Sequence, residues 1–418
     1  MQTLKSRPRI ALLALLLLLA NLFGCAQPPP PAPVLAPAVE NPTFSRTPPV
    51  ANWTFRKKAW SEPPREPAQK GNPFAVDLRL ADLRGVDLRQ SGEVLINHAL
   101  FDTDTKWPSE MPAKFDPAKI MELGKNPGLG VRALHRDGVT GRGIHVAFLD
   151  QTLLLEHEEY AGRILRYDEI GRVETQAAMH GAAVTSLLAG RSTGVAPDVI
   201  ITYYAVQVSA GRSRTFTYLA EAINRIVDEN AKLPDAEKIR VIGAAIGWSP
   251  KEEGYEEIDK AVRRARAEGV FVISSSVDKY YAFKFHGLGR HPLADPDRHN
   301  SYRPGDFWAE QYYRSPESYQ KQFLNGRILV PMDSRTTAAP TGKSAYAFYR
   351  QGGWSWSIPY LVGVYAMGLQ VRPNLTPDEF YQAALETGWY TEFTHDGKSH
   401  RLGPVINPAG IVERLRSL

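Results

Sequence analysis

The sequence predicts a three-layer α/β domain with a mainly parallel sheet, preceded by a small β-rich N-terminal appendage. From about Ile120 onward, short apolar strands alternate with helical segments. Such alternation requires right-handed crossovers, which bury a parallel sheet between layers of helices. The chain has 418 residues and 43% hydrophobic content, so it can bury a large core.

The first 25 residues are typical of an export signal. Lys5, Arg7 and Arg9 precede an apolar run from Ile10 to Ala20, which is too short to span a bilayer comfortably. The run ends in NLFGC, which resembles a bacterial lipoprotein lipobox, and the resemblance implies lipid attachment at Cys25. This predicts an extracytoplasmic lipoprotein attached to a membrane. A plain secretory signal, giving a secreted protein, and a membrane anchor with a buried cysteine are the alternatives.

Two segments separate this signal (residues 1–24) from the α/β region. Residues 25–71 are rich in proline, which predicts a disordered tether. Residues 72–115 contain VDLRL ADLRG VDLRQ, a five-residue unit repeated three times. The unit resembles a pentapeptide repeat, although chance repetition in a strand-turn segment fits equally well. Three units cannot stand alone, so the appendage must pack on a larger body. The resemblance implies inward-pointing side chains at Leu78, Leu83 and Leu88, with small ones at Val76, Ala81 and Val86.

The α/β elements follow from periodicity. Apolar runs of four to eight residues predict buried strands, and apolar positions three or four apart predict helices. Helices are expected at 130–137, 180–190, 217–233, 255–269 and from about 355 to 371, and strands at 144–150, 199–206, 239–248 and 270–277. Residues 279–352 have weaker periodicity, which predicts long loops with one strand at 327–332.

Three residues that could carry chemistry lie at the ends of these elements. Asp150 ends a buried strand, where parallel sheets place their sites, and His180 begins a helix rich in small residues. Ser355 follows Gly353, and Pro359 falls in the predicted first turn of an apolar helix, where proline is tolerated. A serine at a helix N-terminus benefits from exposed amides, which suit a developing oxyanion.

These segments together resemble the subtilisin-like serine peptidase family. The resemblance rests on GVTGRGIHVAFLDQTLLLEHEEY, on MHGAAVTSLLAG with the following GVAP, and on GWSWSIPYLVG. It covers roughly residues 125–390, and the order Asp, His, Ser is that of subtilisin. It implies a peptidase domain over 116–418 and a triad of Asp150, His180 and Ser355, in which the imidazole takes the serine proton and the carboxylate orients the imidazole.

The resemblance also implies how a substrate binds. An extended polypeptide would pair with Ala245, Ile246 and Gly247, and its residue before the cut would contact Ser275 and Val277. The implied activity is that of an exported endopeptidase working through an acyl-enzyme, with no cofactor and no metal.

The sequence departs from the family at Asp278, which takes the position of an asparagine that donates a hydrogen bond to the oxyanion. An ionised carboxylate has no proton to donate, whereas a protonated one does. Three outcomes are open: activity favoured at acidic pH, as in the related sedolisins, activity resting on the Ser355 amide, or a weak catalyst. A local slip in the alignment is a fourth explanation. Val277 replaces a pocket glycine, and Trp354 and Trp356 either cover the nucleophile or pack beneath it.

Other function classes find less support. No long basic tract indicates nucleic acid, and part of the net charge of +5 comes from the signal. His157 lies among acidic residues in LLEHEEY, which we interpret as a solvated turn rather than a metal site. Two rivals to the enzyme remain: a pseudoprotease that binds or regulates at the cell surface, and a structural lipoprotein whose appendage does the binding. The oligomeric state is not predicted.

Overall fold

A computed structural model describes residues 35–67, 75–210 and 213–418. The predicted signal, Cys25 and the first part of the tether lie outside the described residues. Within the described ranges, no helix combines the length and hydrophobicity that crossing a membrane would require.

The centre of the fold is a six-stranded sheet in which every pair of neighbours is parallel. Its order is β1 (Thr43–Phe44), β5 (Ile164–Ile170), β6 (Ile200–Val206), β4 (His145–Asp150), β9 (Val241–Ala244) and β10 (Phe271–Ser274). The predicted α/β class is therefore confirmed. Strand β4 lies between β6 and β9, so the direction of winding reverses at its edge, which is where open α/β sheets place their sites.

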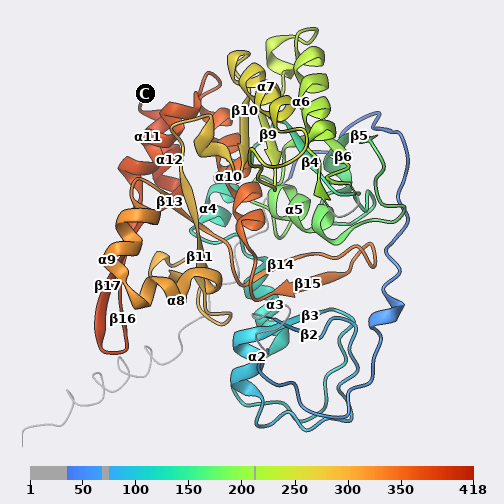
Figure 1. The fold of residues 1–418 in the computed structure, drawn as a ribbon, viewed down its shortest axis with the longest axis vertical. Helices are drawn as coiled ribbons and strands as arrows, with labels where there is room; N and C mark the ends of the chain where they lie inside the picture. The colour runs from blue at the N-terminus through green and yellow to red at the C-terminus, as the bar shows by residue number, and fades with distance from the viewer. Residues whose placement is uncertain (1–34, 68–74, 211–212) are drawn as a thin grey trace, which may run out of the picture. The chain divides into compact units, whose positions relative to one another are not determined.

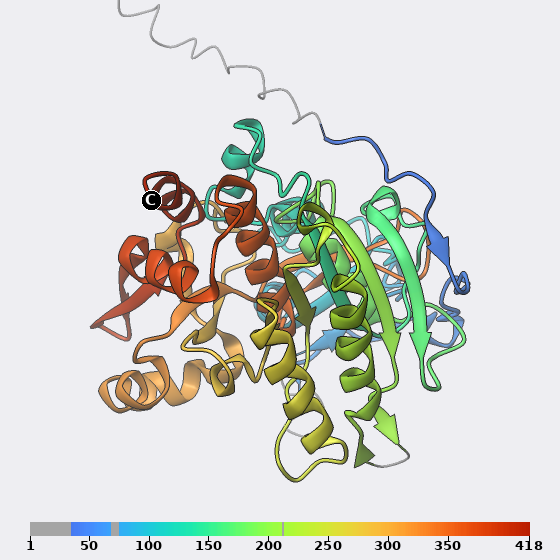
Figure 2. The same cartoon turned by 90° about the horizontal axis from the view of Figure 1, so that it is seen from above.

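Helices cover both faces of this sheet (Figures 1 and 2). On one face, α5 (Met179–Ala189) packs against α10 (Trp354–Val371), and both are apolar almost all round because they are buried. On the other face, α6 (Thr217–Asn230) packs against α7 (Tyr255–Ala267). Each of these two helices buries one apolar stripe and turns a charged face to solvent, as the sequence periodicity predicts.

A second sheet of five strands stands beside the first. Its order is β12 (Tyr302–Pro304), β11 (Phe285–Arg290), β13 (Ile328–Pro331), β17 (Lys398–Val405) and β16 (Trp389–His395). The prediction of long loops over 279–352 is therefore wrong, except for the strand at 327–332. The reason is that the partners are distant in the sequence, since β13 pairs with β17, and local periodicity does not report such pairing. Further elements are α4 (Val131–Arg136), β7 (Ser209–Ala210), β8 (Ser213–Arg214), α8 (Asp306–Arg314), α9 (Pro316–Tyr319), α11 (Pro377–Thr387) and α12 (Pro408–Arg416).

The appendage shares a third sheet with the α/β region. Strands β2 (Val76–Asp77) and β3 (Ala99–Asp102) extend a hairpin formed by β14 (Arg335–Ala338) and β15 (Tyr346–Tyr349). Helices α2 (Gly92–His98) and α3 (Pro117–Lys125) flank it. All six positions predicted to point inward are buried in a separate apolar cluster. The burial pattern fits a repeat, while membership of the pentapeptide family stays a prediction.

Residues 35–67 do not form the predicted disordered tether. Strand β1 extends the edge of the main sheet beside β5, the amide of Ala51 donates to the carbonyl of Pro340 at 2.8 Å, and Arg46 pairs with Glu169 at 2.6 Å. The prediction from proline content is wrong because an extended proline-containing segment can still form hydrogen bonds at a sheet edge through its remaining amides and carbonyls.

Candidate active site

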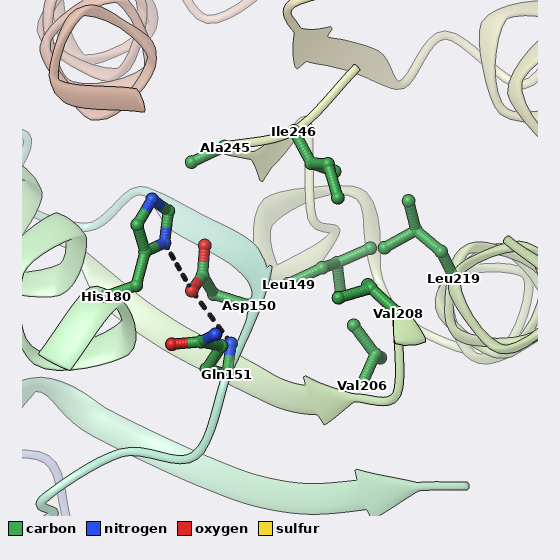
Figure 3. Close-up of a pocket in the computed structure, with 9 residues that line it drawn as sticks. All are labelled: Leu149, Asp150, Gln151, His180, Val206, Val208, Leu219, Ala245 and Ile246. Carbon is green, nitrogen blue, oxygen red and sulfur yellow. Dashed lines mark hydrogen bonds and ion pairs between the residues drawn. The ribbon is translucent and has the colours of Figure 1, made fainter. Parts of the chain in front are cut away.

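Asp150 and His180 form a hydrogen-bonded pair at the carboxyl end of β4. The His180 Nδ1 atom lies 2.7 Å from the Asp150 Oδ1 atom, which also accepts the amide of Gln151 at 2.8 Å (Figure 3). Burial disfavours the imidazolium, but the charge and hydrogen bond of Asp150 outweigh it, so the pKa of His180 is raised. The pair therefore holds the imidazole with Nδ1 toward the carboxylate and Nε2 free to take a proton.

Gly181 explains why a glycine follows this histidine. A Cβ atom at this position would lie 2.7 Å from the carbonyl oxygen of Gln151 and 2.8 Å from that of Thr152. The first turn of α5 thus lies directly on the chain that leaves β4, which brings the imidazole to the carboxylate.

Replacing Gly181 with alanine is expected to lower the free energy of unfolding by about 1–3 kcal/mol, because backbone atoms cannot give way as a side chain would. Urea denaturation measures this. Gly85→Ala is the matched control, since a Cβ there meets nothing within 4 Å. An equally stable Gly181→Ala variant would show that α5 does not depend on this close approach.

Ser355 is the second residue of α10, and Gly353 before the helix has a φ of 75°, a value that favours glycine. The Ser355 hydroxyl donates to the carbonyl of Ala245 at 3.0 Å, so this hydrogen bond must break before the hydroxyl can pass its proton to His180. The prediction that Pro359 lies in the first turn is wrong. The helix starts at Trp354, which places Pro359 inside it, and the missing N–H leaves the Ser355 carbonyl without its usual intrahelical donor.

The two tryptophans beside the serine take different places. Trp356 is buried, with its ring centroid 5.6 Å from that of His180 and 5.3 Å from that of Tyr349. It therefore packs beneath the site. Trp354 lies beside the nucleophile, with its ring against Phe285 at 5.7 Å.

Three pockets surround these residues. The apolar pocket, of about 250 Å³, lies beside the Asp150–His180 pair (Figure 3). It is lined by Leu149, Asp150, Gln151, His180, Val206, Val208, Leu219, Ala245 and Ile246. The sequence reasoning found Asp150, His180, Ala245 and Ile246 and missed the others. Leu149 and Val206 lie at strand ends beside the switch point, and that position was the available signal.

The Ser275 pocket, of about 440 Å³, opens in front of the nucleophile. It is lined by Arg214, Ala245, Ile246, Gly247, Ser275, Phe307, Gly353, Trp354 and Ser355. The structure thus brings together Ser355, the predicted substrate-pairing residues Ala245–Gly247 and the predicted pocket residue Ser275. The carbonyl of Gly247 accepts a hydrogen bond from Arg214 at 2.9 Å.

The Arg79 pocket, of about 470 Å³, lies where the appendage meets the α/β region. It is lined by Arg79, Leu100, Met179, His180, Phe307, Tyr349, Gln351, Gly352, Gly353, Ser355 and Trp356. Both His180 and Ser355 face it, so the imidazole and the hydroxyl share one cavity. Sequence reasoning did not find Arg79, Tyr349 or Gln351.

Two predicted site residues lie outside all three pockets. Val277 is buried in the hydrophobic core. Asp278 lies in the short η4 turn (Val277–Lys279), is 34% exposed and pairs with Arg327 at 3.1 Å. Two residues separate the η4 turn from β10, and the turn places the Asp278 carboxylate beside this cation.

The acidic segment around His157 is not the solvated turn that the sequence predicts. His157 is buried, with Nε2 2.8 Å from the carbonyl of Ala345, and Glu159 accepts hydrogen bonds from Ser192 and Thr193. In the described part of the chain, no cluster of three or more His, Cys, Asp or Glu side chains could hold a metal ion.

Residues 141–302 match the model of the Subtilase family. The subtilase match contains Asp150 and His180 and ends before Ser355.

Two curated relatives resemble the same region. The extracellular serine proteinase of Thermus sp. (strain Rt41A) is 27% identical over 265 residues, which cover 61% of this chain and 58% of the relative. The serine protease AprX of Bacillus subtilis (strain 168) is 24% identical over 276 residues, covering 58% of this chain and 60% of the relative. The chain thus spans about three fifths of the length of each. Both relatives carry a serine protease name.

Among solved structures, the prenylagaramide maturation protease PagA superposes with a TM-score of 0.43 at 19% identity, covering 68% of this chain and 98% of that one. The PatG macrocyclase domain gives a TM-score of 0.46 at 14% identity, covering 70% and 96%.

Proposed function

We propose that this protein is an exported serine endopeptidase that uses Asp150, His180 and Ser355. The observation that carries the proposal is the 2.7 Å bond between Asp150 and His180 at the switch point of the sheet, with Ser355 facing the same pocket. A histidine oriented by a carboxylate and placed beside a serine at a helix N-terminus is suited to acyl transfer.

In the proposed mechanism, the Ser355 hydroxyl leaves the Ala245 carbonyl and turns toward His180. The Nε2 atom takes its proton as the oxygen attacks the peptide carbonyl, and later gives that proton to the leaving amine. Asp150 keeps the proton of Nδ1 in place and stabilises the imidazolium. His180 then takes a proton from a water molecule as that water attacks the acyl-enzyme, and returns it to the Ser355 oxygen as the acid product leaves.

The substrate is an extended peptide. Its residues before the cut lie along Ala245–Gly247, with the side chain next to the cut in the Ser275 pocket and an apolar side chain in the apolar pocket. Apolar contacts from Leu149, Val206 and Leu219 favour such a side chain over a charged one.

The oxyanion is stabilised by the main-chain amide of Ser355 at the start of α10, where amides lack intrahelical partners. Asp278 is not proposed as a donor, because Arg327 binds its carboxylate outside the pockets.

Asp278→Ala is therefore expected to change kcat by less than about threefold, whereas losing a true oxyanion donor costs about 10²–10³. Initial rates on casein, compared with those of Asp259→Ala, measure this. Asp259 is a suitable control because it also pairs with an arginine, Arg263, on α7. A hundredfold loss confined to Asp278→Ala would restore it as a donor.

The proposed location is extracytoplasmic, with the protein attached to a membrane through lipid on Cys25. The N-terminal sequence supports this, and the Thermus relative carries the word extracellular in its name.

A pseudoprotease is the second candidate, and one observation favours it. The Ser355 hydroxyl is bonded to the Ala245 carbonyl, so the nucleophile rests away from its base. A protein that never rotates this serine would keep the cleft for binding alone.

Covalent labelling separates the two candidates. The chain without residues 1–25 is treated with a fluorophosphonate probe from pH 4 to 8, beside Ser355→Ala. Labelling of the wild type that disappears in Ser355→Ala supports the peptidase. A folded wild type that takes no label at any pH would leave the pseudoprotease.

A further inference from the structure

The three repeats of the appendage form the same local contact but in different surroundings. In each one, the arginine forms an ion pair with the aspartate two residues earlier: Asp77 with Arg79, Asp82 with Arg84, and Asp87 with Arg89. The exposed fractions of the three arginine side chains are 8%, 64% and 61%. Only the first arginine is buried, and it is the one that lines the pocket shared by His180 and Ser355.

One carboxylate pairs with two arginines beside the pocket. Asp77 accepts from Arg79 at 2.7 and 2.8 Å and also pairs with Arg56, so one carboxylate balances two guanidinium groups. The lining of the Arg79 pocket contains no carboxylate among the described residues. The Arg79 guanidinium also lies over the rings of Trp53 and Tyr349, with its Cζ atom 5.1 and 5.4 Å from their centroids, so its charge is held firmly at the pocket wall. A substrate carboxylate would be the one anionic group inside this pocket to pair with it.

Arg79 also has donors left for such a ligand. A guanidinium has five N–H groups, and the bonds to Asp77 and to the Tyr349 hydroxyl, at 3.0 Å, use three of them. One hydrogen on each terminal nitrogen remains. The contacts hold the planar group still, so little side-chain freedom is lost when it binds a carboxylate.

The position of the pocket says which part of a substrate reaches Arg79. A peptide that lies along Ala245–Gly247 fills the Ser275 pocket and the apolar pocket with residues before the cut. Beyond Ser355 and His180, the chain enters the Arg79 pocket, which shares both of these residues. Residues after the cut therefore meet Arg79.

We propose that Arg79 binds a substrate carboxylate on the leaving-group side of the cut. This rests on the proposed function, and it makes the appendage part of the substrate site. The carboxylate comes either from an aspartate or glutamate side chain within about three residues after the cut or from the C-terminus of the substrate, which gives the same group to the same donors.

Matched peptides test the proposal. Sites cut in denatured casein are identified by mass spectrometry, and the best of them is remade in three forms. One has aspartate after the cut and an amidated end, one has asparagine and an amidated end, and one has asparagine and a free terminal carboxylate. We expect kcat/KM to be at least about tenfold higher for one carboxylate form than for the neutral form, and the better form identifies the source. A ratio within twofold for both carboxylate forms would overturn the proposal.

Variants of Arg79 test whether this residue causes a preference for the carboxylate peptides. Arg79→Gln should remove the preference, whereas Arg84→Gln, which changes the equivalent arginine of the exposed second repeat, should keep it. Arg79→Lys, which retains the charge, should keep part of it and serves if Arg79→Gln does not fold. In the wild type, the preference should shrink as ionic strength rises. A preference that survives both Arg79 variants unchanged would place the anion site elsewhere.

A binding measurement keeps this test independent of catalysis. Fluorescein-labelled tetrapeptides Gly-Ala-Asp-Ala and Gly-Ala-Asn-Ala, each with an amidated end, and Gly-Ala-Asn-Ala with a free end are titrated into Ser355→Ala, and anisotropy is read. Tighter binding of a carboxylate form supports the Arg79 site even if the wild type cleaves nothing, and cleavage without any carboxylate preference refutes the site while the peptidase stands.

Discussion

Replacing Ser355 with alanine is expected to lower kcat for peptide hydrolysis by about 10⁶, the order of loss that follows removal of a serine nucleophile. Among the described residues that line the Arg79 pocket together with His180, the only other hydroxyl is the phenol of Tyr349. That phenol accepts a hydrogen bond from Arg79, and burial raises its pKa, so it is a poor nucleophile.

Ser357→Ala is the matched control for this experiment. Ser357 lies two residues further along the same helix, is buried, and donates to the carbonyl of Pro331 at 3.2 Å. Its loss is expected to affect stability by about 1 kcal/mol and to leave kcat unchanged. Equal losses in the two variants would mean that the damage comes from the start of α10 and not from a lost nucleophile.

The sequence predicted the part of the fold whose signals are local. Strand β4 is a continuous apolar run and α7 repeats apolar residues at helical spacing, so each can be predicted from its own segment of the sequence. Asp150 and His180 could be found for the same reason, since each lies at the end of such an element. Their 2.7 Å hydrogen bond depends on where β4 lies in the parallel sheet and on the close approach of α5 at Gly181. Neither can be predicted from one segment of the sequence alone.

The parts that failed depend on partners far along the chain. Strand β1 is only two residues long and exists because β5 offers an edge more than a hundred residues later. Strand β3 pairs with β15, so the appendage completes a hairpin of the α/β region. Arg79 reaches the site in the same way, through a hydrogen bond to Tyr349 across 270 positions. The repeat pattern indicated which leucines turn inward, but only the three-dimensional structure distinguishes the first arginine from the other two.

The role of Asp278 stays a prediction, and its surroundings are also set by a distant residue. Its position after β10 is the one that the family resemblance indicates, yet the side chain pairs with Arg327, which precedes β13. The sequence near Asp278 does not reveal this partner, because Arg327 lies 49 positions later. The prediction for Asp278→Ala tests the role of Asp278 directly.

Replacing Asp150 with asparagine is expected to lower kcat by about 10⁴ near pH 8, while the serine and the histidine remain. The loss has two causes. An amide offers no negative charge to stabilise the imidazolium, and it can present its NH₂ group to Nδ1, which would place the imidazole proton on Nε2 and block the base. The comparison variant is Asp168→Asn, because Asp168 is a strand carboxylate in β5 that is paired with Arg166 and lies outside the pockets. It is expected to keep the wild-type kcat.

The pH profile of the same variant gives an independent test of the role of Asp150. In the wild type, burial lowers the pKa of His180 and Asp150 raises it further than burial lowers it, so the pKa is raised overall. The base must be neutral, and activity is therefore expected to fall as the pH drops through this raised pKa. In Asp150→Asn only the burial remains, so the pKa of His180 should fall below its ordinary value, and the acidic limb of the residual activity should move to lower pH. A limb that stays in place while kcat falls would mean that Asp150 orients the ring without setting its charge, and a limb that moves to higher pH would contradict the pairing of these two residues.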